Sequence, residues 1–283
     1  MDTNPIDLAH LRQWLQRQDQ REDRADAGPA RRMAATVDDT PRALADGDPL
    51  PPLWHWLYFL EAAPRTALGH DGHHARGGFL PPVPLPNRMW AGGQLEWLAP
   101  LRLGASMTRH SRVRSVDAKT GRSGPLVFVT VEHVVESGGE VCLREAHDIV
   151  FKGAARGSAP ADEAPPTALQ REAWTPDSTQ LFRYSALTFN GHRIHYDADY
   201  CRAVEGYEAP VVHGPLIATR LAGLGEQVLG RALSRFSYRA RRPVTLGQTL
   251  ALCAAPAPED GLALWAEEGG GATAMVRSEE HTS

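Results

Sequence analysis

The segment with the most reactive side chains in this sequence runs from residue 184 to residue 197. Within a few positions it holds an amide (Asn190), two imidazoles (His192 and His195), a guanidinium (Arg193) and a carboxylate (Asp197). Imidazole is the side chain that most often transfers protons near neutral pH. The segment is therefore the first candidate for a functional site, although an isolated histidine after a strand is more often a packed or capping residue.

A second motif, His213-Gly214-Pro215, follows at the end of an apolar run. Pro215 suits the first turn of a helix, where its missing N–H costs nothing, and we predict a helix over residues 215–229. Its apolar stripe, which predicts burial, consists of Leu216, Ile217, Leu221, Leu224 and Val228. The beginning of a buried helix offers unpaired N–H groups and a positive dipole end, which suit a developing oxyanion.

A third group of polar side chains comprises His70, Asp71, His73 and His74 in a predicted loop over residues 68–86. Histidine and aspartate are common ligands of transition metals. No other part of the sequence completes a ligand set for them, so we expect no metal ion and no cofactor. Asp197 and His192 have structural explanations, respectively as the N-cap of a helix over 198–204 and as a packed histidine.

Short elements should position these motifs. Periodicity and turn residues predict helices over 6–18 and 29–37, and strands over 126–135, 140–152, 181–187, 233–242, 249–254 and 262–267. We divide the chain into an N-terminal domain (1–155), a linker rich in Ala and Pro (156–176) and a C-terminal domain (177–283). A length of 283 residues suits two domains of about 100–150 residues each.

A faint repeat links the two predicted domains. Pro100-Leu101-Arg102-Leu103-Gly104 and Pro243-Val244-Thr245-Leu246-Gly247 share the order proline, aliphatic, any residue, leucine, glycine, 143 positions apart (243 minus 100). Such a turn arises independently in many β proteins. Its place between an aromatic segment and a strand in both halves nevertheless suggests duplication of one sheet-and-helix unit.

The bulk composition is that of an ordinary globular protein. A net charge of −4 indicates neither a nucleic-acid partner nor an anionic membrane partner. Three scattered cysteines, Cys142, Cys201 and Cys253, fit a reducing compartment better than a disulfide framework. Without a signal-peptide pattern, and with no apolar stretch near the ~20 residues that span a bilayer, the sequence predicts a cytoplasmic protein.

The two motifs resemble the MaoC-like double hot-dog hydratase/dehydratase family, whose signature is Asp-x-Asn-Pro-(Ile/Leu)-His followed by a His-Gly step. Asn190 stands where the family has its catalytic Asp, His195 stands where it has its catalytic His, and Gly214 matches its oxyanion-hole glycine. His192 and Arg193 replace the Asn-Pro pair.

Residues 77–86 and 124–128 are similar to the N-terminal dehydratase-like half of the mesaconyl-CoA (3-methylfumaryl-CoA) and itaconyl-CoA hydratase branch. This resemblance implies an α+β fold of two hot-dog units, each an antiparallel sheet wrapped around a central helix, packed as a pseudo-dimer within one chain.

The resemblance also implies a mechanism. His195 would take a proton from water that adds to the β-carbon of an unsaturated acyl-CoA, while the Gly214 N–H holds the thioester oxygen. Asn190 could orient that water but could not accept its proton. Arg183 and Arg193 could bind the distal carboxylate of a mesaconyl group, although both could equally be solvent-facing. The expected product from mesaconyl-CoA is citramalyl-CoA.

Two alternatives stay open. The chain could be a general 3-hydroxyacyl-thioester dehydratase, or, because of Asn190, a non-catalytic acyl-CoA-binding protein; thioesterase activity is less expected. The partner is an acyl-CoA thioester, with no nucleic acid and no membrane, and a homodimer is one option for the oligomeric state. Residues 277–283 (RSEEHTS) are polar, unlike the family's ending and similar to a translated sequencing adapter, so we assign no function to His281.

Overall fold

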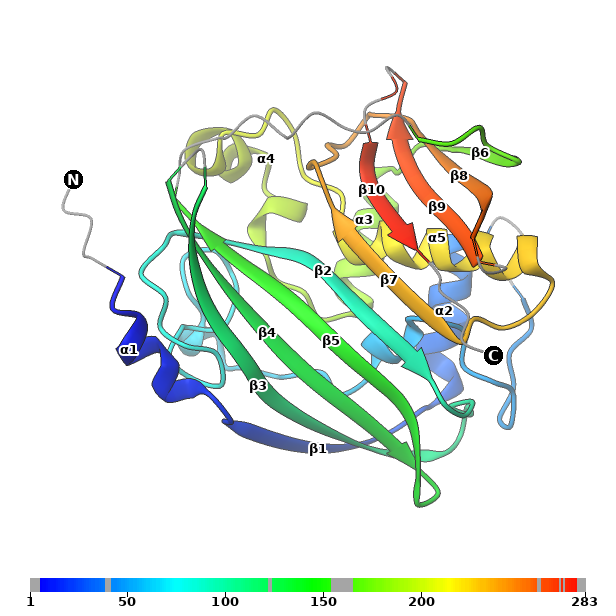
Figure 1. Cartoon of the computed structure of the whole chain (residues 1–283), viewed down its shortest axis with the longest axis horizontal. Helices are drawn as coiled ribbons and strands as arrows, with labels where there is room; N and C mark the ends of the chain where they lie inside the picture. Colours follow the sequence, from blue (N-terminus) through cyan, green and yellow to red (C-terminus); the bar gives the residue numbers. More distant parts are fainter. Residues whose placement is uncertain are drawn as a thin grey trace.

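The computed structural model describes residues 6–38, 42–121, 124–153, 165–258, 261–269, 271 and 273–278. They form one ten-stranded antiparallel sheet in the order β1-β3-β4-β5-β2-β7-β10-β9-β8-β6 (Figure 1). The strands are β1 (Gln18–Arg24), β2 (Asn87–Trp97), β3 (Ser106–Gly121), β4 (Gly124–Ser137), β5 (Glu140–Lys152), β6 (Gln170–Trp174), β7 (Arg235–Ala240), β8 (Leu250–Ala257), β9 (Gly261–Glu268) and β10 (Thr273–Ser278).

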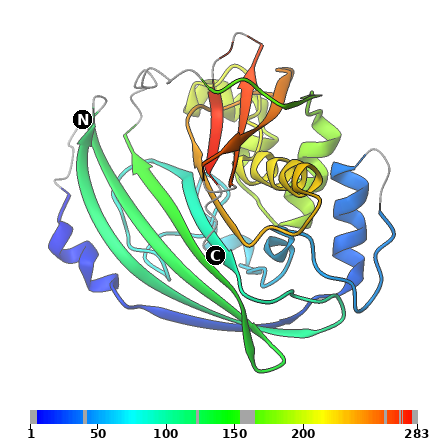
Figure 2. The same cartoon turned by 45° about the vertical axis from the view of Figure 1, so that its right-hand side comes forward.

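One long helix, α5 (Gly214–Leu229), packs against β7, β8 and β9 (Figures 1 and 2). Its predicted stripe is buried, because Leu216, Ile217, Leu221 and Leu224 are at most 3% exposed. The other helices are α1 (Leu8–Leu11), α2 (Ala27–Val37), α3 (Ser178–Leu187) and α4 (Ala198–Tyr200), with 3-10 turns at Arg12–Trp14, Trp54–Leu57, Arg65–Ala67 and Arg193–His195 and a π turn at Cys201–Glu205. None of the described helices is long and apolar enough to cross a membrane.

The sheet consists of two five-stranded halves with the same strand order. Read from its outer edge, each half presents its first, third, fourth, fifth and second strands: β1-β3-β4-β5-β2 and β6-β8-β9-β10-β7. The two inner strands, β2 and β7, pair with each other. The chain is therefore a pseudo-dimer of two similar units, as expected for the double hot-dog class.

The two repeat segments occupy equivalent places in these units, between β2 and β3 and between β7 and β8. The Leu103 N–H donates to the carbonyl oxygen of Asp48 (2.9 Å), and the Leu246 N–H donates to that of Pro210 (2.8 Å). The glycines that close the segments both have positive φ, 82° and 94°, a conformation that glycine adopts without strain. The repeat read from the sequence is thus a structural repeat.

The two units differ in the element that follows the acceptor residues of these hydrogen bonds, Asp48 and Pro210. In the C-terminal unit the chain enters α5, whereas in the N-terminal unit it makes only the 3-10 turn Trp54–Leu57. The expectation of a full central helix in both units is therefore wrong for the first one. Phe59, at φ 58°, and Pro64 divert the chain away from a helical path directly after the turn.

Two other sequence predictions are corrected. Residues 181–187 form part of α3 and not a strand, because the Asp177 side chain caps the helix by accepting from the Gln180 N–H (2.7 Å). A short apolar run does not distinguish a helix from a strand by periodicity alone. Residues 6–18 hold only α1 and one 3-10 turn, after which the chain enters the edge strand β1.

The remaining element predictions are confirmed within a few residues. Part of the predicted linker, residues 170–174, is the edge strand β6 of the second unit. Residues 156–164 lie outside the described part of the chain. In the suspected foreign tail, the backbone of residues 277 and 278 continues β10, and residues 279–283 are not described.

The contact between the two units depends on a glycine pair in β2. Gly92 pairs with Arg239 and Gly93 with Tyr238 across the seam between β2 and β7. A Cβ atom on Gly92 would lie 2.5 Å from the carbonyl oxygen of Tyr238, and one on Gly93 would lie 2.5 Å from its hydroxyl. Larger residues would therefore push the two halves apart.

We predict that Gly92→Ala destabilises the whole chain by ~1–3 kcal/mol, the usual effect of forcing an extra carbon into a packed site. Gly223→Ala is the matched control, because no atom lies within 4 Å of the added Cβ. Because Gly223 lies in the interior of α5, Gly223→Ala should stabilise the chain by roughly 0.5–1 kcal/mol. Urea denaturation of both variants checks this, and equal midpoints would contradict the role of the seam.

Candidate active site

His195 lies at the end of the 3-10 turn Arg193–His195 and is 9% exposed. Its Nδ1 is 2.7 Å from the carbonyl oxygen of Val211. A carbonyl only accepts hydrogen bonds, so Nδ1 carries the proton and Nε2 keeps its lone pair. Burial lowers the pKa of His195 to about 4, and the ring is therefore a neutral base near pH 7.

The ring of His213 stacks on that of His195, with centroids 3.7 Å apart and planes at 18°. His213 is the N-cap residue of α5, and its Nε2 lies 2.8 Å from the hydroxyl of Ser185. Burial, followed by the charge of a protonated His195, lowers the pKa of His213. The stack therefore holds two neutral imidazoles at the first turn of the buried helix.

Gly214 begins α5 directly after this stack. Its N–H has no acceptor among the described residues, as is usual for the first residue of a helix. The side of Gly214 that a Cβ would occupy faces Trp90, 3.5 Å away. An unpaired N–H at the positive end of a 16-residue helix is a suitable partner for an oxyanion.

Asn190 lies at the wall of a cavity, with its Oδ1 accepting from the backbone N–H of His192 (3.0 Å). The preceding Phe189 has φ 50°, an unusual conformation for an aromatic residue. The hydrogen bond occupies the Asn190 oxygen, so the NH₂ group is the part of the amide that can donate to a ligand. The amide can hold a water or carbonyl oxygen but cannot take up a proton.

The cavity at this wall has a volume of about 690 Å³, which suits a small acyl group. Ser185, which lines the cavity and bonds to His213, connects it to the paired imidazoles. Its lining is mixed, with the apolar side chains Leu68, Phe79, Leu80, Phe151, Phe182 and Phe189, and the basic side chains His73, His74, Arg76 and Arg88.

A loop of the N-terminal unit packs directly on the first motif. The Arg193 N–H donates to the carbonyl oxygen of Asp71 (2.9 Å), and the rings of His73 and His192 lie 4.1 Å apart. Gly72 permits this approach, since a Cβ there would lie only 2.0 Å from the carbonyl oxygen of Gly191. The sequence pattern marked this loop as unusual, but only the fold shows that it completes the site.

The same contact gathers three metal-type ligands. Ligand atoms of Asp71, His73 and His192 lie within 4.8 Å of one another, so the expectation that nothing completes a ligand set was wrong. Both carboxylate oxygens of Asp71 already accept from His73, one from its N–H (3.0 Å) and one from Nδ1 (3.2 Å). Although burial alone would raise it, these bonds hold the pKa of Asp71 below its usual value. The hydrogen bonds thus explain the cluster without an ion.

The two arginines singled out by the sequence are engaged elsewhere. Arg193 donates to Asp197 (2.8 Å) and stacks over the ring of Tyr200, 4.2 Å from its centroid. Arg183 donates to the carbonyl oxygen of Ala35 in α2 (3.1 Å). Neither belongs to the cavity wall. The structure therefore places His195 beside Gly214, through the stack with His213, and Asn190 on the cavity wall, whereas these guanidiniums are at neither place.

Asp197 caps α4 as expected, because its side chain accepts from the N–H of Tyr200 (2.9 Å). This carboxylate is consequently committed to structure and to its ion pair with Arg193. It offers no second acid/base group beside His195.

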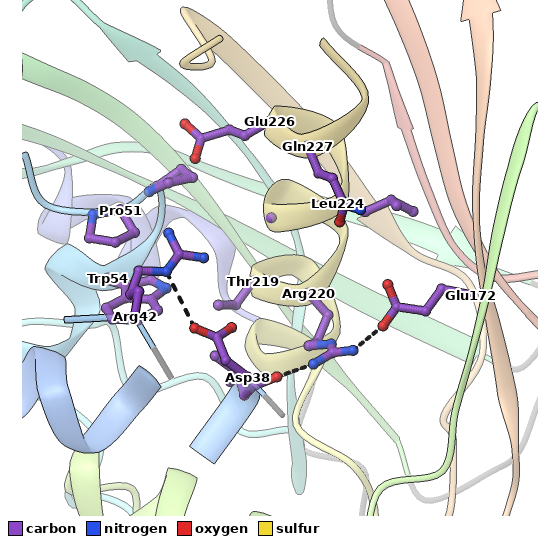
Figure 3. A pocket seen from close by; sticks show the side chains of 13 residues that line it. Asp38, Arg42, Pro51, Trp54, Glu172, Thr219, Arg220, Leu224, Glu226 and Gln227 are labelled. Atoms are coloured by element: carbon purple, nitrogen blue, oxygen red, sulfur yellow. Dashed lines mark hydrogen bonds and ion pairs between the residues drawn. The ribbon is translucent and has the colours of Figure 1, made fainter. Parts of the chain in front are cut away.

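A second cavity, of about 540 Å³, lies between the N-terminal unit and the outer face of α5 (Figure 3). Its charged side chains pair with one another, Arg42 with Asp38 (3.3 Å) and Arg220 with Glu172. No residue of the 184–197 segment lines it. Ser185, Phe189, Asn190 and Tyr196 of that segment line the first cavity instead.

Comparison with known proteins identifies the family of the chain. The profile of the family described as "Hydroxyacyl-thioester dehydratase type 2" matches residues 53–246. The "Mesaconyl-C(4)-CoA hydratase" of Chloroflexus aurantiacus is 42% identical over 271 residues, covering 94% of this chain and 96% of that protein. The mitochondrial "Hydroxyacyl-thioester dehydratase type 2" of Schizosaccharomyces pombe is 26% identical and covers 72% of this chain and 77% of its own length.

Solved structures support the fold. A MaoC-like dehydratase from Phytophthora capsici superposes with a TM-score of 0.71 at 15% identity, covering 98% of this chain and 99% of that one. A Mycobacterium tuberculosis protein described as having a double hotdog fold gives a TM-score of 0.59 at 13% identity, covering 94% and 95%. Together with the paired half-sheets, these likenesses confirm the double hot-dog class.

The contact between the loop and the motif generates a prediction. Gly72→Ala should detach residues 69–74 from the motif, because the added Cβ meets the Gly191 backbone and φ is 86°. Gly77→Ala is the matched control, since it has φ 91° but meets only Pro82 Cβ at 3.6 Å. Limited proteolysis should cut the loop much faster in Gly72→Ala than in Gly77→Ala. Equal cleavage would mean that backbone strain alone matters.

Proposed function

The chain belongs to the hydroxyacyl-thioester dehydratase type 2 family and is a hydro-lyase of the acyl-CoA hydratase/dehydratase type; we propose that it hydrates a C5-dicarboxylyl-CoA such as mesaconyl-CoA. The product of mesaconyl-CoA would be citramalyl-CoA. The observation that carries this proposal is the buried, neutral His195, whose Nε2 is left free beside the first turn of α5.

The reaction needs one base and one oxyanion partner. His195 Nε2 takes a proton from water as the water oxygen bonds to the β-carbon of the substrate. Electron density from the double bond moves onto the thioester oxygen, which the Gly214 N–H and the dipole of α5 stabilise. His195 then returns the proton to the α-carbon, so that the elements of one water molecule are added. Dehydration is the reverse.

In this scheme Asn190 would position the water or the thioester group of the substrate. Asn190 lines the cavity, and its oxygen accepts from the His192 N–H. It can therefore donate to the water or to the thioester but cannot share the proton transfer. Because one base suffices for both proton steps, Asn190 does not by itself favour the non-catalytic alternative.

The dicarboxylate substrate rests on the relative named as a mesaconyl-C(4)-CoA hydratase, which is similar over nearly the whole chain. The basic side chains of the cavity support it. A general 3-hydroxyacyl-thioester dehydratase is the second candidate, favoured by the family description and the fungal relatives. Hydration rates for mesaconyl-CoA and crotonyl-CoA separate the two, because equal kcat/KM values would favour the general enzyme.

His195→Ala tests the base. We expect hydration to fall by roughly 10²–10⁴, the usual contribution of a positioned acid/base group, while binding of a CoA ester changes little. Asn190→Asp should keep substantial activity, and Asn190→Ala should be slower than wild type but faster than His195→Ala. Steady-state kinetics and calorimetric binding of a saturated analogue measure both quantities. Wild-type rates in His195→Ala would refute the mechanism.

The pH profile tests the protonation state. Burial disfavours the charged ring and lowers the pKa of His195 to about 4, so the neutral, active form persists far below the usual histidine pKa. We expect kcat/KM for hydration to stay constant from pH 7 to about 5 and to fall as the pH drops through about 4. Enzyme incubated at low pH and assayed at pH 7 controls for unfolding. An acid limb near 6.5 would show that His195 is not the buried base described.

A further inference from the structure

The guanidinium of Arg88 is the one basic group of the cavity for which the described part of the chain shows neither a hydrogen bond nor an ion pair. Arg88 lies near the start of β2, and its backbone pairs with that of Phe151 in β5. Burial lowers the pKa of Arg88 to about 10, so the group is still charged at neutral pH. Arg88 is half-buried, and a partly desolvated charge without a partner is unfavourable for stability.

The neighbouring groups do not neutralise it. Arg76 uses its own N–H groups on the carbonyl oxygens of Val83, Leu85 and Pro86, and so has a structural role. Asp71 is close enough for its charge to act on Arg88, but both of its oxygens accept from His73. The donor fork of Arg88 therefore remains available to a ligand.

We propose that Arg88 binds the distal carboxylate of the acyl group and thereby makes the enzyme selective for dicarboxylyl-CoA substrates. This inference rests on the proposed function. A guanidinium and a carboxylate form two parallel charge-assisted hydrogen bonds, which fix the orientation of the acyl chain as well as its charge.

The place of Arg88 relative to the base supports this. Its charge acts on both His73 and His192, and the ring of His192 lies 5.5 Å from that of His195. Arg88, His73 and Asn190 also line the same cavity, so an acyl group in that cavity can reach both Arg88 and the 184–197 motif. Phe151, the strand partner of Arg88, is fully buried, so the site is internal, where an acyl group is expected and strongly hydrated CoA phosphates are not.

The test compares Arg88→Met with wild type on mesaconyl-CoA and crotonyl-CoA. We expect kcat/KM for mesaconyl-CoA to fall by roughly 10- to 100-fold, as for loss of a charge-assisted bond, and that for crotonyl-CoA to change less than about threefold. Arg88→Lys, which keeps the charge but loses the fork, should fall between the two. Arg42→Met is the matched control, because Arg42 lines the second cavity and pairs with Asp38.

Thermal unfolding supplies a second measurement. Removing a half-buried charge that has no partner should raise the Tm of Arg88→Met, whereas loss of a purely structural arginine would lower it. A lower Tm together with equal losses on both thioesters would therefore overturn the proposal.

Crotonyl-pantetheine, which lacks the CoA phosphates, shows whether Arg88 binds the distal carboxylate of the acyl group or a phosphate of CoA. If Arg88→Met loses rate equally on mesaconyl-CoA and crotonyl-CoA but not on crotonyl-pantetheine, Arg88 binds a phosphate and the proposal is wrong. An unchanged preference in a folded Arg88→Met also overturns it and leaves the proposed function standing. A wild-type enzyme that hydrates neither CoA ester overturns both.

Discussion

The hydrogen bond from His195 Nδ1 to the carbonyl oxygen of Val211 is the interaction on which the site depends. It selects the tautomer that leaves Nε2 free. Val211 is held from both sides, since its N–H donates to Ile194 (2.7 Å) and its backbone bridges Thr245 in the second repeat segment. The same short stretch leads into α5. Val211 therefore links His195, the second repeat segment and the N-terminus of α5.

The two halves of the chain differ around this site. The C-terminal half has the long helix α5, whose first turn lies beside His195, while the N-terminal half has only the 3-10 turn Trp54–Leu57 at the equivalent place. The N-terminal half instead supplies the loop around Gly72 that packs on the motif, and the strand β2 that carries Arg88. The two units thus share one frame but contribute different parts: the C-terminal unit carries His195 and α5, and the N-terminal unit contributes to the shape and charge of the pocket.

Burial governs the electrostatics of the site. The stacked rings of His195 and His213 are both kept neutral by exclusion of water. The same desolvation weakens the hydration of Arg88, so that this cation would interact strongly with an anionic group in the cavity. A site of this kind sacrifices some stability for a preorganised arrangement of base, oxyanion partner and charge.

The sequence by itself determined the motif around His195, the buried helix from Gly214, the repeat at Pro100 and Pro243 and five of the ten described strands. These depend on local spacing, on turn residues and on apolar periodicity. Only the tertiary structure decided that residues 181–187 are helical, that the N-terminal central helix is lost and that Asp71 and His73 reach His192. It also showed that Arg193 is bound to its near neighbour Asp197, whereas Arg88 lines the cavity without a hydrogen bond or ion pair to any described residue. The physical reason is that these outcomes depend on contacts between residues distant in sequence, which the periodicity of either segment alone does not contain.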